Sequence, residues 1–164
     1  MKHLILIRHA ESAEKVTGQI DKDRELTTAG MRQAASSGQF LKNQFSHIDI
    51  ILSSAAIRAA TTAQLIAEQL KASTDLIEIE DELYQASVGT IFQMLRDGDH
   101  YNNVAIVGHN PAISYFAEFI TDSGVEEMKP GCVLILKLDI GNWKDLQKGC
   151  ATLLDRFDAD VRTW

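Results

Sequence analysis

Cysteine, proline and long apolar runs are all scarce in this sequence of 164 residues. The two cysteines, Cys132 and Cys150, show no CxxC spacing and are too few for a disulfide framework. We therefore expect reduced thiols and a cytoplasmic protein. No segment approaches the roughly 20 apolar residues that span a bilayer, and the apolar start Leu4–Ile7 is too short for a signal-peptide core. The sequence predicts neither a membrane span nor an export signal.

Positive charge is also in short supply. Lysine and arginine together number 16 against 23 acidic residues, which gives a formal net charge of −7. Nonspecific binding to nucleic acid or to an anionic membrane needs clustered positive charge, so we expect neither as a partner. A few arginines can still form a local positive pocket in an acidic protein. An anionic small molecule or protein substrate is therefore compatible with this composition.

The chain has no internal repeat, no low-complexity tract and no linker rich in proline or glycine. Since a domain averages about 150 residues, we expect a single domain over residues 1–164. Short, apolar, β-branched runs predict buried strands at 3–9, 48–52, 76–79 and 104–107. Two further strands, at 133–138 and 151–157, are expected to pair antiparallel around a loop that holds Trp143.

Segments with helical spacing of apolar residues separate these strands, at 31–45, 59–70, 87–98 and 110–120. Thr27 or Thr28 is expected to cap the first helix, and Asn110–Pro111 to supply the cap and first residue of the last. Alternating strands and helices predict an α/β three-layer sandwich whose mixed sheet is mainly parallel. Ligands of such sheets bind beyond the carboxyl ends of the strands.

Polar side chains stand at four predicted strand ends. The first strand leads into Arg8 and His9, and the second into Ser53–Ser54, with Arg58 one helical turn later. The third leads to Glu80, Asp81 and Glu82, and the fourth to Gly108 and His109. If these strands are neighbours, two arginines, two histidines and a carboxylate converge on one rim of the sheet.

These residue types suit phosphoryl transfer. The planar guanidinium fork matches phosphate oxygens, and a neutral imidazole nitrogen can attack phosphorus and carry the phosphoryl group covalently. A second histidine can hydrogen-bond the equatorial oxygens. Because phosphoryl transfer depends mostly on positioning and electrostatics, such a set needs neither a metal nor an organic cofactor.

Each of these residues also has an ordinary interpretation. A histidine at a strand end is usually a packed or surface residue, an arginine on an alanine-rich helix is usually solvated, and an acidic run is usually an exposed loop. His9, Glu11 and His109 also raise the alternative of a metal site. Their spacing matches no established zinc pattern, and the nearby arginines would repel a divalent cation, so we expect no bound metal.

At these residues the sequence resembles the histidine phosphatase superfamily, also described as phosphoglycerate mutase-like. The run Leu6–Ser12 resembles the family signature, and Arg24–Gly30 followed by Gln33–Ala34 resembles the segment that opens its first helix. Segments 53–63 and 107–111 resemble its second-arginine and second-histidine motifs, and Pro130–Gly131 precedes a similar carboxy-terminal strand pair. The resemblance covers nearly the whole chain.

The resemblance implies a role for each of these residues. His9 becomes the nucleophile and transient phosphohistidine, while Arg8, Arg58 and His109 become the phosphate pocket. Larger relatives carry insertions that build a lid, but residues 66–104 leave no room for a large cap insertion. An open site suits a phosphate on a protein surface. The likeness is therefore strongest to the SixA-type phosphohistidine phosphatases, which act on phosphorelay or phosphotransfer proteins.

Glu82 is the candidate general acid, since it falls near the position where many members keep one. SixA-like members depend on such an acid less, because the P–N bond to an imidazole leaving group is weak. If Glu82 reaches the site, phosphoserine or small phosphate esters become more credible substrates. The alternatives are thus a phosphatase for a small phosphorylated metabolite and a non-catalytic module that binds phosphoprotein. A mutase is less favoured, because an open site excludes water poorly.

Overall fold

The computed structural model describes residues 1–45, 47–98 and 101–159. Its centre is a six-stranded sheet in the order β3-β2-β4-β1-β5-β6. The strands are β1 (Lys2–Arg8), β2 (Ile50–Ser54), β3 (Ile77–Glu80), β4 (Asn103–Gly108), β5 (Val133–Leu138) and β6 (Ala151–Phe157). The first four are parallel, whereas β5 runs antiparallel to β1 and β6 antiparallel to β5. The mixed, mainly parallel sheet is therefore confirmed, as is the antiparallel pair at its end.

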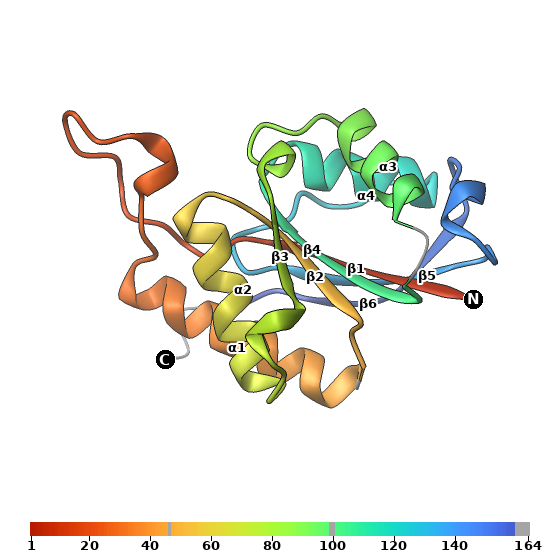
Figure 1. The fold of residues 1–164 in the computed structure, drawn as a ribbon, viewed down its shortest axis with the longest axis horizontal. Coiled ribbons are helices and arrows are strands. Elements are labelled where there is room, and N and C mark those ends of the chain that lie inside the picture. Colours follow the sequence, from red (N-terminus) through yellow and green to blue (C-terminus); the bar gives the residue numbers. More distant parts are fainter. Residues whose placement is uncertain (46, 99–100, 160–164) are drawn as a thin grey trace.

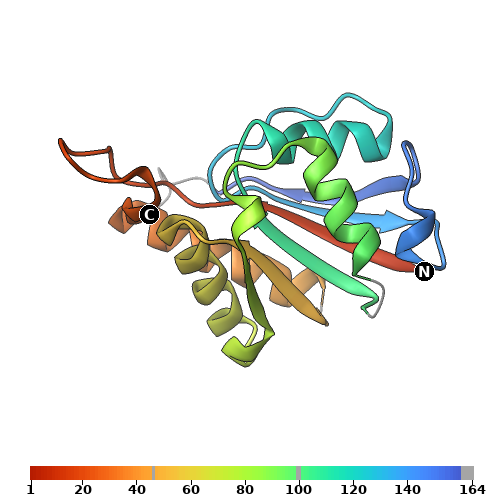
Figure 2. The same ribbon diagram turned by 45° about the horizontal axis from the view of Figure 1, so that its top comes forward.

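Helices cover both faces of this sheet, which confirms the three-layer prediction (Figures 1 and 2). One face carries α1 (Thr28–Gln44) and α2 (Ile57–Gln69), and the other carries α3 (Val88–Asp97) and α4 (Ala112–Thr121). Side chains alternate along a strand, so Ile5 and Ile7 of β1 join the core under α1 and α2. Leu4 and Leu6 join the core under α3 and α4.

Of the two sequence signals for helix starts, the one for α1 is confirmed. The Thr27 hydroxyl caps α1 by accepting a hydrogen bond from the Gly30 backbone N–H at 2.9 Å. The prediction for α4 was wrong, since this helix begins at Ala112 and Asn110 does not cap it. The Asn110 amide instead donates to the Met128 carbonyl at 2.7 Å, and its oxygen accepts from the Ser114 hydroxyl at 2.6 Å. Asn110 thus fastens the start of α4 to the segment before β5.

Strand β3 is not the buried strand that its apolar residues suggested. It lies at the edge of the sheet and pairs with β2 alone, which leaves Ile79 49% exposed. Strand β2 begins and ends two residues later than predicted, and it therefore includes Ser53 and Ser54. Between β3 and β4 the chain forms a 3₁₀ turn, η3 (Asp81–Leu83), and then α3, with no large cap insertion.

A second 3₁₀ turn, η1 (Asp21–Asp23), lies in the long connection between β1 and α1 that projects from the body of the molecule (Figure 1). Two more, η2 (Thr74–Leu76) and η4 (Trp143–Asp145), precede β3 and β6. Trp143, in the loop that joins β5 and β6, is fully buried. Among the helices of the described residues, none combines the length and apolarity needed to cross a membrane.

Candidate active site

The register of the sheet places the two predicted histidines side by side. Arg8 pairs with Gly108 across parallel strands β1 and β4, so the next residue of each strand reaches the same edge. The rings of His9 and His109 lie with their centroids 5.0 Å apart. Arg58 arrives from the first turn of α2, which follows β2. The structure thus brings together all four residues that the sequence singled out for the phosphate pocket.

These four residues share a pocket of about 480 Å³ at the carboxyl end of the sheet. The remaining lining residues come from the β1–α1 connection, from the segment after η3 and from the start of the β4–α4 and β5 segments: Glu11, Ser12, Asp21, Arg24, Tyr84, Gln85, Asn110 and Pro130. The pocket is open to solvent, whereas His9 and Arg58 at its base are only 8% and 5% exposed. A small anion can therefore reach deeply seated cationic and imidazole groups.

His9 is held in the state that a nucleophile requires. Its Nδ1 lies 2.8 Å from the Ala10 carbonyl oxygen. Since a carbonyl can only accept, Nδ1 carries the hydrogen and Nε2 keeps its lone pair. Burial, opposed by this hydrogen bond and helped by the nearby His109 and Arg58, lowers the pKa of His9 to about 3. The ring is therefore neutral, with a free lone pair, throughout the physiological range.

The backbone on either side of His9 is fixed by several elements. The Ala10 N–H donates to the Thr62 hydroxyl at 3.1 Å, and that hydroxyl donates to the Arg58 carbonyl at 2.7 Å. The Gly131 N–H donates to the His9 carbonyl at 3.2 Å. These contacts join the end of β1 to α2 and to the start of β5, so the orientation of the imidazole depends on both.

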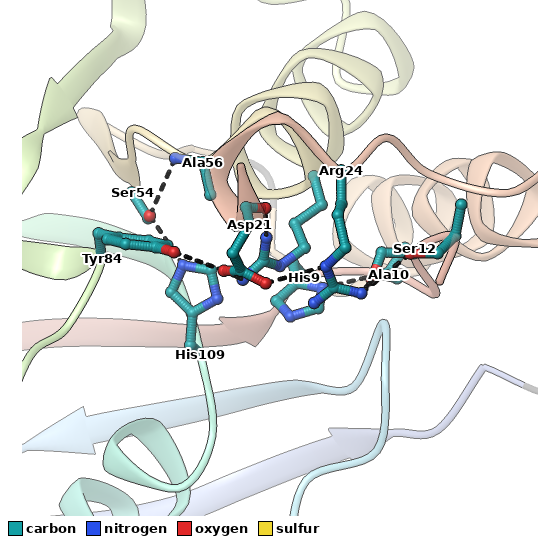
Figure 3. Close-up of polar contacts among 11 residues, drawn as sticks. His9, Ala10, Ser12, Asp21, Arg24, Ser54, Ala56, Tyr84 and His109 are labelled. Carbon is teal, nitrogen blue, oxygen red and sulfur yellow. Dashed lines mark hydrogen bonds and ion pairs between the residues drawn. The ribbon is translucent and has the colours of Figure 1, made fainter. Parts of the chain in front are cut away.

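His109 is held from the neighbouring strand, since its Nε2 lies 2.8 Å from the Ser54 hydroxyl oxygen (Figure 3). Burial and the charge of Arg58 lower the pKa of His109 to about 4. His109 is therefore also neutral, and the two adjacent rings do not repel each other. A neutral imidazole at this place can donate a hydrogen bond to a phosphate oxygen without adding charge to the free site.

Hydrogen bonds to Met128 and Asp21 orient the guanidinium groups of Arg8 and Arg58. Arg8 donates from Nη1 to the Met128 carbonyl at 3.0 Å. Arg58 donates from Nη1 to the Asp21 carbonyl at 2.8 Å and from Nη2 to the Asp21 carboxylate at 3.0 Å. Within the described part of the chain, the buried Nε atoms of both arginines have no hydrogen-bond partner. Both arginines line the pocket.

Asp21 is a carboxylate of this site that the sequence reasoning missed. Its side chain lies between Tyr84 and Arg24 in Figure 3 and accepts from the Tyr84 hydroxyl and from the guanidinium groups of Arg24 and Arg58. The Tyr84 and arginine hydrogen bonds hold the pKa of Asp21 well below its ordinary value. No spacing in the sequence shows that the projecting β1–α1 connection returns to Arg58, so only the fold reveals Asp21.

Glu82, the predicted general acid, does not line this pocket. It is exposed and lies instead along two neighbouring depressions. Successive side chains of a 3₁₀ turn point in directions about 120° apart. Leu83 of η3 therefore enters the core and Tyr84, which follows η3, enters the site, while Glu82 faces elsewhere. Tyr84 also packs edge-on against the His109 ring, with centroids 5.7 Å apart. The prediction that a carboxylate from the third strand end joins the site was therefore wrong.

Glu11, which the sequence placed in a competing metal site, does line the pocket with His9 and His109. Across residues 1–45, 47–98 and 101–159, however, no group of three or more histidine, cysteine, aspartate or glutamate side chains is placed to hold a metal ion.

Cys132 and Cys150 are both free, and burial raises the pKa of Cys132 to about 12.

Comparison with known proteins gives the same family. Residues 4–97 match the Histidine phosphatase superfamily (branch 1). An uncharacterized protein of Mycobacterium tuberculosis (strain H37Rv) is 31% identical over 159 residues, covering 90% of this chain and 96% of the relative. The candidate phosphohistidine phosphatase SixA of Nakamurella multipartitia has a similar structure, with a TM-score of 0.83, 26% identity and coverage of 96% of both chains.

A mycobacterial glucosyl-3-phosphoglycerate phosphatase shares the fold more distantly, with a TM-score of 0.67, 14% identity and coverage of 97% of this chain and 99% of the other. The match in the family profile extends over more than half of the chain, and the resemblance noted from the motifs, including that to SixA-type proteins, is confirmed. The chain belongs to the histidine phosphatase superfamily.

Proposed function

We propose that this protein hydrolyses phosphohistidine on a partner protein through a covalent intermediate at His9. Membership of the superfamily supports phosphatase activity. The observation that carries the proposal is the state of His9, a neutral ring whose Nδ1 is bonded to the Ala10 carbonyl and whose Nε2 keeps a lone pair. That nitrogen belongs to a side chain in a pocket with Arg8, Arg58 and His109.

The reaction proceeds in two displacements. Nε2 of His9 attacks phosphorus, and the bond from phosphorus to the leaving group breaks with its electron pair remaining on the leaving group. Water then attacks the phosphohistidine, which releases inorganic phosphate and restores the neutral imidazole. In both steps Arg8, Arg58 and His109 hydrogen-bond the equatorial oxygens, where charge is spread in the transition state. We propose that no metal takes part and that residues 1–164 form one such domain.

The position of Glu82 favours phosphohistidine over phosphate esters. An ester oxygen leaves as an alkoxide unless an acid protonates it, whereas an imidazole with a protonated second nitrogen leaves as a neutral molecule. Glu82 is exposed and outside the pocket, so it is poorly placed to protonate a leaving oxygen. Likeness to a phosphohistidine phosphatase of the SixA type supports the same substrate class.

A small phosphorylated metabolite is the second candidate substrate. A pocket of about 480 Å³ has room for a compact phosphate ester. The mycobacterial glucosyl-3-phosphoglycerate phosphatase shows that this fold also serves such a molecule. A non-catalytic phosphoprotein-binding module is less well supported, because binding alone does not require a nucleophile with a free lone pair.

Phosphate release from a histidine-phosphorylated carrier protein tests the proposal, with a phosphoserine peptide and a sugar phosphate as alternative substrates. Wild type is compared with His9→Ala and with His47→Ala, a matched control because the His47 side chain is 75% exposed and outside the pocket. We expect release from the carrier that His9→Ala abolishes and His47→Ala retains. Release from the small esters alone would move the substrate to metabolites, and turnover that survives His9→Ala would refute the mechanism.

A further inference from the structure

A second depression lies between strand β3 and helix α3, and it extends from Glu82 of η3 toward the amino ends of β2 and β4. We call it the β3–α3 groove, and its volume is about 310 Å³. Its floor and one wall are apolar, made by side chains of β2, β4, α3 and the following segment: Ile50, Leu52, Met94, Leu95, Tyr101 and Val104. Its rim is acidic, with Glu78, Glu80, Glu82 and Asp97. No lysine or arginine is among the described residues that line it.

The groove exists because the helices on this face do not cover the edge of the sheet. Side chains of β3 alternate, so Ile77 packs under α2 while Glu78 and Glu80 face the side of α3. Helix α3 packs over the more central strands through Ile91 and Leu95, which are both 2% exposed. The surface between α3 and β3 therefore remains open, with carboxylates along both sides.

Among the described residues, no cation lines this groove, and Lys22 lines only the neighbouring depression beside Asp81 and Glu82. Burial and the adjacent Glu78 and Glu82 raise the pKa of Glu80 above its ordinary value. Mutual repulsion of this kind is relieved by a positive charge placed between the groups. The chemistry of the groove, an apolar floor below a negative rim, matches a side chain with an aliphatic stem and a cationic head, as lysine and arginine have.

An intermediate depression lies between the groove and the candidate active site and shares lining residues with each. Tyr84 and Gln85 line both the phosphate pocket and a shallow intermediate depression, and Glu82 lines both that depression and the groove. These residues follow one another along η3 and the segment after it. A chain whose phosphorylated side chain enters the first pocket can therefore continue along η3 to the groove without leaving the surface.

We propose that the β3–α3 groove binds a lysine or arginine of the phosphoprotein substrate, a few residues from its phosphohistidine. The inference rests on the proposed function and adds a substrate preference to it: a basic residue on the phosphorylated segment. The phosphate pocket holds the anionic group, and the groove holds a cation on the same chain. This arrangement would distinguish a protein substrate from a small phosphate ester, which reaches the first pocket alone.

Hydrolysis of phosphohistidine peptides tests this preference. Lysine is placed from three to six residues from the phosphohistidine, roughly 10–20 Å along an extended chain, and compared with glutamine at the same position. We expect kcat/KM to be about tenfold higher for the best lysine peptide, mainly through KM. Glu78→Gln/Asp97→Asn should remove that preference and leave the glutamine peptide unaffected. A matched control, Glu68→Gln/Asp139→Asn, changes two exposed acids outside the groove and should keep it.

A binding measurement separates this inference from the proposed function. Fluorescence anisotropy follows an unphosphorylated peptide with lysine next to apolar residues as it binds wild type and the two double variants. Weaker binding to Glu78→Gln/Asp97→Asn alone supports the groove even if no phosphohistidine is hydrolysed. Equal binding to all three proteins, or hydrolysis that depends on His9 but not on the lysine, overturns the groove and leaves the proposed function standing.

Discussion

Thr62 joins the backbones of the two elements that carry His9 and Arg58, so its hydroxyl offers a sensitive test of how the site is held. The side chain is fully buried. It accepts from the Ala10 N–H at 3.1 Å and donates to the Arg58 carbonyl at 2.7 Å. The Ala10 carbonyl in turn holds His9 Nδ1. Thr62→Val keeps the shape of the side chain and removes both hydrogen bonds.

The loss of stability in Thr62→Val follows from the backbone groups that lose their hydrogen-bond partner. The Ala10 N–H becomes a buried, unsatisfied donor, which costs roughly 1–3 kcal/mol. The Arg58 carbonyl loses only an additional bond, because it lies in a helix whose own hydrogen bonds remain. We therefore expect a loss of about 2 kcal/mol in the free energy of unfolding. For a domain of this size that lowers Tm by roughly 4–8 °C.

Catalysis should suffer as well, because the Ala10 peptide sets the orientation of the His9 ring. A small misplacement of a reacting atom can cost up to about a hundredfold in rate, so we expect kcat for phosphate release to fall by about tenfold or more. Thermal unfolding and phosphate release are measured for Thr62→Val and for Thr61→Val, which changes a partly buried threonine on the same helix. Thr62→Val behaving like the Thr61 control in both assays would refute this account of how His9 is positioned.

Four further predictions concern the same site and the packing of helix α1 against Glu11. By ¹⁵N NMR at pH 5.5, His9 should be a neutral Nδ1–H tautomer, since its pKa is lowered to about 3; an imidazolium there would contradict the burial argument. Because unfolded histidine takes up its proton near pH 6.5 and folded His9 does so only near pH 3, the free energy of unfolding should fall as pH drops through that interval. Asp21→Asn removes a negative charge paired with Arg58, so inorganic phosphate should inhibit the enzyme about three- to tenfold more strongly. Weaker inhibition of the variant would show that Asp21 chiefly positions the arginine. Gly30→Ala would place a Cβ 2.0 Å from the Glu11 carbonyl oxygen, so α1 must shift. Urea unfolding should then show a loss of about 1–3 kcal/mol in the free energy of unfolding, and wild-type stability would contradict this packing.

The sheet and its phosphate pocket were predictable because their signals are local. His9 and His109 each stand two residues beyond an apolar run, and parallel register then brings the histidines together. The edge position of β3 was not predictable in this way. Its apolar residues predicted a buried strand, but which strand lies at the edge depends on how the whole sheet is ordered.

The rest of the site depends on contacts between distant segments. Asp21 reaches Arg58 across 37 positions of sequence, and Tyr84 reaches Asp21 across 63. Neither contact has a signature at short spacing. Glu82 lies in η3 and Tyr84 directly after it, and the packing of Leu83 into the core decides which of them faces the pocket.

The covalent intermediate is the central claim, and a rapid-quench experiment tests it most directly. A carrier protein with a ³²P-labelled phosphohistidine is mixed with the enzyme, the reaction is stopped with alkali within milliseconds, and label on the enzyme is located by peptide mapping. Our account predicts label on His9 that forms and decays at rates sufficient for turnover, and its absence in His9→Ala. Phosphate release by wild type with no label on His9, unchanged in His9→Ala, would contradict it.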